Sequence, residues 1–394
     1  MSRTHRTIAL VCALALSIPL AAPAETPAQQ RIRAARERME RAPSASERAA
    51  ALIALASAHT ARARESGEGA HYDRALEALR RAREAGAAGG ELTKIAAWVR
   101  LGRHEFRAAE ALARQSVGQA PGDHESWGLL GDALMELGRS DEAADAYQRM
   151  MDLRPGPGAY LRASYYRERV GDLEAAAELL ERALAATGAR ESEQVAWILV
   201  HRASLEDRLG HSARAEALLR QALSRFPGYH YALTALAEHH LEHGRPDEAL
   251  PWARRALDAA PHAERWLILA DALRATGRED EAREAEDRFE RTALANVDQP
   301  DNENLFLVDY YLDRRPNPSR ALAIARREAA RRPDPPTLER LARAERRHRG
   351  EADDRDPGGP AGQLRHAAPE MTLRRGKPPG SPQIRAAPGG SMGA

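Results

Sequence analysis

Three side chains in one short segment, His239-His240-Leu241-Glu242-His243, have the types and spacing to bind a metal ion and activate water. His239 and His243 are four residues apart, so on a helix both imidazoles would lie on one face and could bind one Zn²⁺ ion. Glu242 could act as a general base toward metal-bound water. The order of these residues fits the H-x-x-E-H pattern of one class of zinc peptidases. A metallopeptidase-like site at residues 239–243 is therefore one interpretation.

A second interpretation of this segment needs no metal. A third protein ligand would have to come from another part of the chain, and the sequence marks no residue for that role. His239 and His243 also stand where a similar segment carries the apolar residues Ala133 and Leu137. No glycine-rich phosphate loop or Ser/His/Asp arrangement stands out. We therefore predict a protein that is not an enzyme and has no cofactor and no metal site; His239 and His243 are the residues that would bind a metal if one were held here.

The composition favours helices and disfavours nucleic acid as a partner. Alanine, leucine, arginine and glutamate dominate, and aromatic residues make up only 5% of the chain, so local propensity is helical. The 59 Lys and Arg residues nearly balance the 58 Asp and Glu residues. The chain as a whole therefore lacks the positive field of a protein that coats nucleic acid. An RNA-binding helical repeat is a disfavoured alternative.

The first 24 residues are typical of a secretory signal peptide. Arg3 and Arg6 precede an apolar run over residues 7–20, and Ala22-Pro23-Ala24 is a small-x-small cleavage site. The run is shorter than the about 20 residues that cross a membrane. We expect cleavage before Glu25 and a periplasmic or extracellular protein without a membrane span. Retention of the segment as an anchor is the alternative.

The two ends of the chain limit its chemistry further. Cys12 is the single cysteine and lies in that apolar run, so the mature chain would have no thiol for a disulfide, catalysis or metal binding. Lipid attachment at Cys12 is the alternative. Residues 351–394 are rich in Gly and Pro and carry basic residues with few apolar ones, which predicts a disordered basic tail. Such a tail could contact anionic surfaces weakly.

The middle of the chain is internally repetitive. A helix-length segment ends in Gly, an Ala follows five residues later, and a Pro closes three of the five units. The period is roughly 34 residues, with one longer interval before the third glycine. The glycines are Gly138, Gly171, Gly210, Gly244 and Gly277, the alanines Ala143, Ala176, Ala215, Ala249 and Ala282, and the prolines Pro155, Pro227 and Pro261.

The pattern is fullest in residues 124–155, and it resembles the tetratricopeptide repeat (TPR), particularly as found in exported bacterial proteins. The matching residues are Trp127, Leu130, Gly131, Leu134, Gly138, Ala143, Tyr147 and Pro155. The resemblance covers roughly residues 45–350. It implies an all-α fold, an α-α superhelical solenoid of helical hairpins that binds a protein or peptide.

The resemblance predicts the domain organisation. Residues 1–24 are the signal peptide, 25–44 an N-terminal helix or linker, 45–350 the solenoid and 351–394 the tail. The solenoid is divided into degenerate repeats at 45–85 and 90–121, clearer repeats at 124–156, 157–190, 196–227, 230–261, 263–295 and 302–333, and a capping helix at 337–347.

Each recurring residue has a mechanical role. Glycine can adopt the left-handed conformation that ends a helix, and small residues let two antiparallel helices approach closely. The small residues expected before the turns are Gly131, Ser164, Ala203, Ala237 and Ala270. Around residues 186–194 the longer interval predicts a protruding loop or a change of superhelical pitch. Near Arg315 the turn lacks Gly, so Pro316, Asn317 and Pro318 must form it differently.

In the family, the first helix of each repeat lines a concave groove that binds peptides, which implies a set of groove candidates here. They are Asp132, Glu136, Tyr165, Glu168, Arg169, Trp197, Asp207, Arg208, Tyr231, Glu238, Glu242, Asp271 and Arg274. Carboxylates outnumber cations, so we expect a neutral or cationic peptide, with aromatic residues supplying apolar area. The alternative is that these charges only solvate an exposed helix face. We expect a protein-interaction scaffold of the bacterial cell envelope, as an accessory to assembly or transport.

Overall fold

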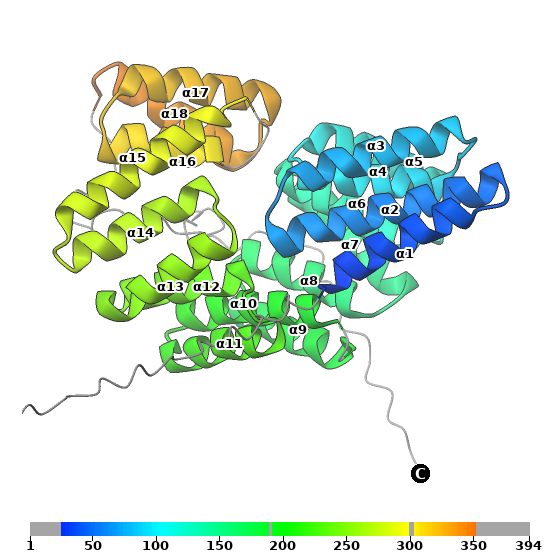
Figure 1. Cartoon of the computed structure of the whole chain (residues 1–394), viewed down its shortest axis with the longest axis horizontal. Coiled ribbons are helices and arrows are strands. Elements are labelled where there is room, and N and C mark those ends of the chain that lie inside the picture. The colour runs from blue at the N-terminus through cyan, green and yellow to red at the C-terminus, as the bar shows by residue number, and fades with distance from the viewer. Residues whose placement is uncertain (1–24, 189–190, 299–302, 352–394) are drawn as a thin grey trace, which may run out of the picture.

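A computed structural model describes residues 25–188, 191–298 and 303–351 (Figure 1). This part of the chain contains eighteen α-helices, one π-helical turn and no β-strand. The helices are α1 (Pro27–Arg41), α2 (Ala45–Ser66), α3 (Ala70–Glu84), α4 (Gly90–Gly102), α5 (Phe106–Gln119), α6 (His124–Glu136), α7 (Ser140–Leu153), α8 (Pro157–Arg169), α9 (Leu173–Ala186), α10 (Ser192–Arg208), α11 (Ser212–Arg225), α12 (His230–Glu242), α13 (Pro246–Ala259), α14 (Ala263–Ala275), α15 (Glu279–Ala295), α16 (Glu303–Asp309), α17 (Pro318–Arg331) and α18 (Pro335–His348). The expected signal peptide and residues 352–394 of the expected tail lie outside the described residues.

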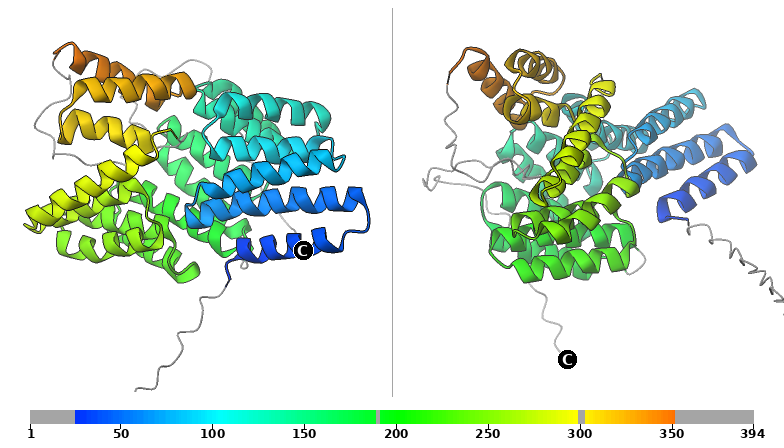
Figure 2. Two further views of the ribbon diagram at one scale, coloured as in Figure 1. Left: turned by 45° about the horizontal axis from the view of Figure 1, so that its top comes forward. Right: turned by 60° about the vertical axis from the view of Figure 1, so that its left-hand side comes forward.

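The helices form hairpins that stack into a superhelix (Figures 1 and 2). The two helices of each hairpin, such as α6 with α7 or α12 with α13, pack along each other. The first helices also contact one another from hairpin to hairpin, as α4 does with α6 and α12 with α14. These first helices therefore line the inner side. The predicted all-α solenoid is confirmed, and none of the described helices has the length and apolarity needed to cross a membrane.

Glycines end the first helices by the same mechanism in successive hairpins. At the end of α6, Gly138 has φ +75°. Its amide donates to the carbonyl of Met135, and the Arg139 amide donates to that of Leu134. This pattern satisfies helix-end carbonyls and requires a left-handed residue. Gly171, Gly210, Gly244 and Gly277 also have positive φ, as expected.

The expected small residues lie in the interface between the two helices of each hairpin, called the seam below. A Cβ atom added to Gly131 in α6 would lie 2.3 Å from the ring of Tyr147 in α7, so this position has no space for a side chain. Ser164, Ala203, Ala237 and Ala270, at the same place in the next hairpins, are all buried. Each seam is therefore close-packed through small residues on at least one helix.

The last hairpin turns without glycine. After α16 the chain forms a π-helical turn, Tyr310–Arg314, and the Asn317 amide then donates to the carbonyl of Tyr311. The Asn317 side chain caps α17 by accepting from the Arg320 amide. The sequence correctly indicated a different turn here but not the π-helical geometry.

The long interval before the third glycine is accommodated partly by a longer helix. α10 has 17 residues, whereas α6, α8 and α12 each have 13. Residues 189–190, at the centre of the expected loop, lie outside the described residues.

The hairpin of α2 and α3, called the N-terminal hairpin below, reaches across the superhelix. The end of α2 contacts α10 and α12, which lie more than a hundred residues further along the chain. Arg64 in α2 pairs with Glu193 in α10 at 2.7 Å. The His230 ring in α12 contacts the carbonyl of Arg64 at 3.2 Å. A Cβ added to Gly67, after α2, would lie 2.3 Å from the His262 ring. The end of α2 therefore closes one side of the inner face.

A second contact joins the C-terminal pair of helices, α17 and α18, to the N-terminal half of the chain. The two parts lie beside each other in Figure 2. A Cβ added to Gly138 would lie 3.1 Å from the ring of Pro335. Burial lowers the pKa of His104, in the turn between α4 and α5, to about 3, and Arg332 is close enough for its charge to add to this shift. The superhelix is therefore closed at both ends by its own chain.

Candidate functional site

The expected groove residues all lie on first helices of the hairpins. α6 carries Asp132 and Glu136, α8 carries Tyr165, Glu168 and Arg169, α10 carries Trp197, Asp207 and Arg208, α12 carries Tyr231, Glu238 and Glu242, and α14 carries Asp271 and Arg274. Each of these residues is half-buried or exposed, whereas their helical neighbours Ala133, Leu236 and Ala270 are buried.

Two acidic groove residues pair with arginines of the following hairpin. Asp132 accepts hydrogen bonds from Arg162, at 2.9 Å to Nε and 2.7 Å to Nη2. Glu168 forms an ion pair with Arg208. Both pairs connect consecutive first helices, so they fix neighbouring hairpins relative to each other as well as lining the groove.

The C-terminal part of the groove repeats this arrangement. Asp271 in α14 accepts two hydrogen bonds from Arg314, each of 2.7 Å. Arg274 donates to Glu286 in α15 at 2.8 Å. Asp271 is therefore half of a bidentate pair, the strongest geometry for an arginine–carboxylate contact.

Glu136 and Tyr165 interact directly between α6 and α8. The Tyr165 hydroxyl donates to Glu136 at 2.8 Å. Burial raises the pKa of Glu136, although this hydrogen bond and the charge of Arg169 oppose the shift. Burial also raises the pKa of Tyr165 well above its ordinary value.

Trp197 and Tyr231 lie where the N-terminal hairpin crosses the inner face. The Trp197 ring contacts the His201 ring at a centroid distance of 3.8 Å and a tilt of 45°, and the Arg64 guanidinium lies 5.9 Å from the Trp197 ring centre. Tyr231 is 42% exposed and packs against His230. The end of α2 therefore already occupies part of the surface around Trp197.

These contacts change the interpretation of groove charge. The carboxylates of Asp132, Glu168 and Asp271 are neutralised by arginines of the same chain. Glu238 is half-buried and Glu242 exposed on α12. The preference for a neutral or cationic peptide remains a prediction.

The sequence analysis missed the arginine partners and Arg64. Arg162 lies 30 residues after Asp132, and Arg314 lies 43 after Asp271. Opposite charges 30–43 residues apart, on consecutive hairpins, were therefore a usable signal. Arg64 had no such signal, because its contact depends on superhelical closure.

The segment with metal-binding spacing gains a third group from the preceding hairpin. Asp207, His239 and His243 each offer one ligand atom, all within 4.8 Å of one another. His239 Nδ1 is 2.7 Å from Asp207 Oδ2, and His239 Nε2 is 3.7 Å from Glu216 Oε2. Glu242, which the sequence suggested as a general base, is not a member of this group.

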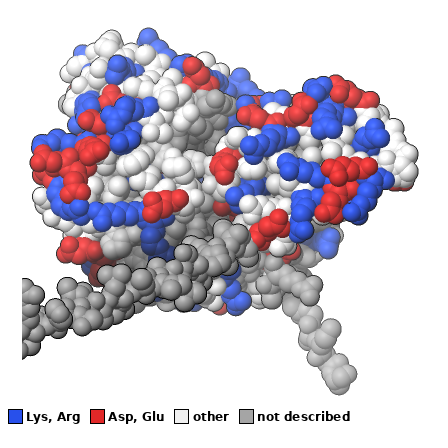
Figure 3. Space-filling view, in the orientation of Figure 1, with Lys and Arg blue, Asp and Glu red and all other residues white. Residues whose placement is uncertain are grey.

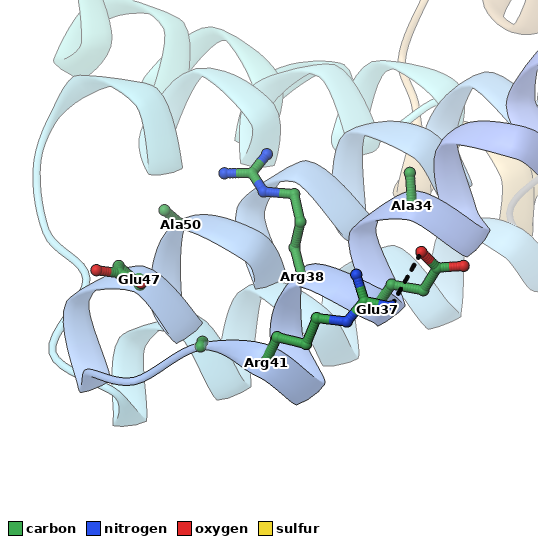
Figure 4. Close-up of a pocket in the computed structure, with 7 residues that line it drawn as sticks. Ala34, Glu37, Arg38, Arg41, Glu47 and Ala50 are labelled. Carbon is green, nitrogen blue, oxygen red and sulfur yellow. Dashed lines mark ion pairs between the residues drawn. The ribbon is translucent and has the colours of Figure 1, made fainter.

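The remaining surface shows mixed charge and a shallow hollow. On the face shown in Figure 3, basic and acidic side chains are interspersed. The hollow beside α1 and α2 is lined by residues that include Ala34, Glu37, Arg38, Arg41 and Glu47 (Figure 4). Glu37 and Arg41 pair there at 4.0 Å. This arrangement has solvated charges and no convergent chemistry.

Comparison with known families identifies the repeat. Residues 96–159 and 202–264 match the tetratricopeptide repeat family model. No curated protein sequence matches the chain.

Several solved structures are similar to this chain. A chain of the APC/C hetero-tetramer Cut9-Hcn1 has 16% identity and a TM-score of 0.53, with 80% of this chain and 59% of that chain covered. This protein thus spans about three fifths of the matched chain. The human IFIT1 dimer with PPP-AAAA has 17% identity and a TM-score of 0.51, with coverage of 76% and 73%. TTC0263, a TPR protein of Thermus thermophilus, has 26% identity and a TM-score of 0.41, with coverage of 47% and 98%.

Proposed function

This chain is a tetratricopeptide repeat protein, and from that premise we propose that it is a non-catalytic scaffold that binds a protein or peptide segment along its concave face. The observation that carries the proposal is the inner face built from successive first helices, on which Tyr165 and Trp197 are half-buried and Tyr231 is exposed. Such aromatic side chains supply large contact areas at low conformational entropy.

The segment it binds is neutral or cationic. Asp132, Glu168 and Asp271 already have arginine partners, so a cationic ligand would gain little there. Glu238 and Glu242 lie about two and three helical turns after the exposed Tyr231, on the same face of α12. This combination suits a lysine- or arginine-containing segment with an apolar residue.

The place of action is the cell envelope, where the protein serves as an accessory to assembly or transport. The basic start and apolar run before Ala22-Pro23-Ala24 support export. N-terminal mass spectrometry of the protein from its source cells tests this, with Glu25 as the expected first residue. An intact Met1 start in the cytosolic fraction would exclude export.

Site-specific photo-crosslinking tests the binding face. A crosslinking residue at Tyr231 is expected to capture protein in source-cell extracts, whereas one at Arg149, on the second helix α7, serves as the matched control. Equal capture at both positions, or none at Tyr231, contradicts the groove proposal. Adducts at Tyr231 that disappear after ribonuclease treatment favour RNA as the ligand.

Charge reversal tests the ligand preference separately. The double variant Glu238→Lys/Glu242→Lys is expected to weaken partner binding at least tenfold at low salt, with a smaller effect at high salt because screening shortens the range of the field. Charge reversal at exposed Glu84 on α3 is the control. Unchanged affinity in the double variant removes the charge preference but leaves the groove proposal intact.

A further inference from the structure

We propose that Asp207, His239 and His243 form a binding site for one divalent transition-metal ion of the Zn²⁺ type, which joins two neighbouring hairpins. Asp207 lies in the last turn of α10, His239 in α12, and His243 directly after α12. The site is therefore built across two consecutive first helices, on the concave side.

The ligand atoms are close to a metal-binding geometry. One atom from each of the three residues lies within 4.8 Å of the others. Bonds of about 2.0–2.2 Å in a tetrahedral Zn²⁺ site place ligand atoms about 3.5 Å apart. Small side-chain rotations would bring Asp207, His239 and His243 to these separations.

His243 presents its lone pair toward the site. Its Nδ1 atom is 2.7 Å from the carbonyl oxygen of His239, and since a carbonyl only accepts, Nδ1 carries the proton. Nε2 of the neutral ring is then unprotonated, and it lies 3.9 Å from Asp207 Oδ1. A backbone carbonyl that orients the second ring nitrogen is the usual support of a metal-binding histidine.

The second ring nitrogen of His239 also faces a hydrogen-bond acceptor, the Glu216 carboxylate. The Nδ1 atom of His239 now bonds to Asp207 Oδ2, and a metal ion would replace the proton between them. Its Nε2 atom would then carry the proton and face the Glu216 carboxylate, 3.7 Å away. Carboxylate, histidine and metal in this order are a recurrent arrangement in zinc sites.

Two buried polar atoms at the site make no hydrogen bond. They are His239 Nε2 and Asp207 Oδ1. The His239 side chain is only 1% exposed, so solvent water does not supply a hydrogen bond to its Nε2 atom. A cation bound between His239 Nδ1 and the Asp207 carboxylate would offset the charge on Oδ1 as well as Oδ2 and let His239 Nε2 donate to Glu216.

Charge and access also allow binding. Asp207 supplies a negative ligand, and Arg245, the nearby cation, is paired with Glu216 at 2.9 Å and Glu248 at 3.8 Å. The His243 side chain is 35% exposed, so an ion can enter from solvent and keep a water in the fourth position.

Titration of the metal-free mature chain with Zn²⁺ tests the proposal. We expect one equivalent bound with a raised melting temperature in the wild type, and a fall in affinity of at least tenfold in Asp207→Asn and in His243→Ala. His211→Ala, which removes an exposed histidine near the end of α10, is expected to bind normally. Circular dichroism checks that each variant is folded.

Co²⁺ substitution gives a readout that depends on the ligands themselves. An intense visible absorption typical of four-coordinate Co²⁺ is expected in the wild type and should be lost in His243→Ala. Failure of the wild type to bind Zn²⁺, while Asp207→Asn still lowers the melting temperature, would show a structural hydrogen bond only and overturn the proposal. Binding that survives both substitutions would assign the metal to other histidines and overturn it equally.

Discussion

Arg64 and Glu193, 129 residues apart in sequence, form a 2.7 Å ion pair that connects the N-terminal hairpin to α10. Glu193 also accepts a hydrogen bond of 3.1 Å from the buried Tyr229 hydroxyl. The pair lies at the point where α2 crosses the groove beside Trp197. Loosening this pair is therefore predicted to expose the surface around Trp197.

We predict that Glu193→Gln loosens the N-terminal hairpin while the later hairpins stay folded. The pair is partly exposed, so its coupling energy in a double-mutant cycle with Arg64→Met should be about 1 kcal/mol. Hydrogen exchange should accelerate in α1 and α2 but not in α13 or α14. Glu77→Gln, which breaks an exposed pair within α3, is the control. Unchanged exchange in α2 would show that the ion pair does not hold the closure.

Gly131 is predicted to be required for close packing of α6 against α7. Gly131→Ala would place a methyl group against the Tyr147 ring and should destabilise the protein by about 1–3 kcal/mol in urea denaturation. The matched control is Gly118→Ala in α5, where a Cβ meets nothing within 4 Å. That change should be neutral or stabilise by up to about 1 kcal/mol, because alanine is the better helix former. Equal effects of the two substitutions would disprove the seam argument.

His104 is predicted to destabilise its turn through backbone strain. Among the described residues it is the one non-glycine with positive φ, at +57°, and its amide and that of Glu105 bond as Gly138 and Arg139 do. His104→Gly should be more stable than His104→Ala by about 1 kcal/mol, since both remove the ring and only glycine avoids the strain.

The reverse change provides the control for this turn. Gly210 has φ +84°, and an added Cβ would meet open space. Gly210→Ala should therefore lower the free energy of unfolding by about 1 kcal/mol through backbone strain alone. If alanine were tolerated at both positions, the left-handed conformation would not limit the stability of these turns.

The hairpins could be predicted from sequence because their signals are local. Gly138 and Ala143 lie five residues apart, and their spacing alone places a turn and a buried helix face. The closure could not be predicted, because it depends on rotations summed over many hairpins before Arg64 meets Glu193. For the same reason the sequence could mark His239 and His243 but not assign Asp207 as their partner, although it placed Asp207 in the groove.

His230 makes the closure sensitive to acid. Its Nδ1 accepts a hydrogen bond of 2.8 Å from Arg265, so the proton is on Nε2, which donates to the carbonyl of Arg64. Burial, with a smaller contribution from Arg265, lowers the pKa of His230 from 6.5 to about 3. The folded state therefore requires the neutral ring, whereas the unfolded state binds a proton near pH 6.5.

We predict that the contribution of His230 to stability is complete above pH 6.5 and declines as the pH falls toward 3. The free energy of unfolding should fall by up to about 1.4 kcal/mol per pH unit relative to that of the His230→Gln variant. The glutamine amide is uncharged, and it can donate to the carbonyl of Arg64 and accept from Arg265. Urea denaturation of both proteins between about pH 7 and pH 4 measures this difference. NMR titration should show the His230 ring neutral at about pH 5, and a protonation midpoint near 6.5 in the folded protein would contradict the prediction.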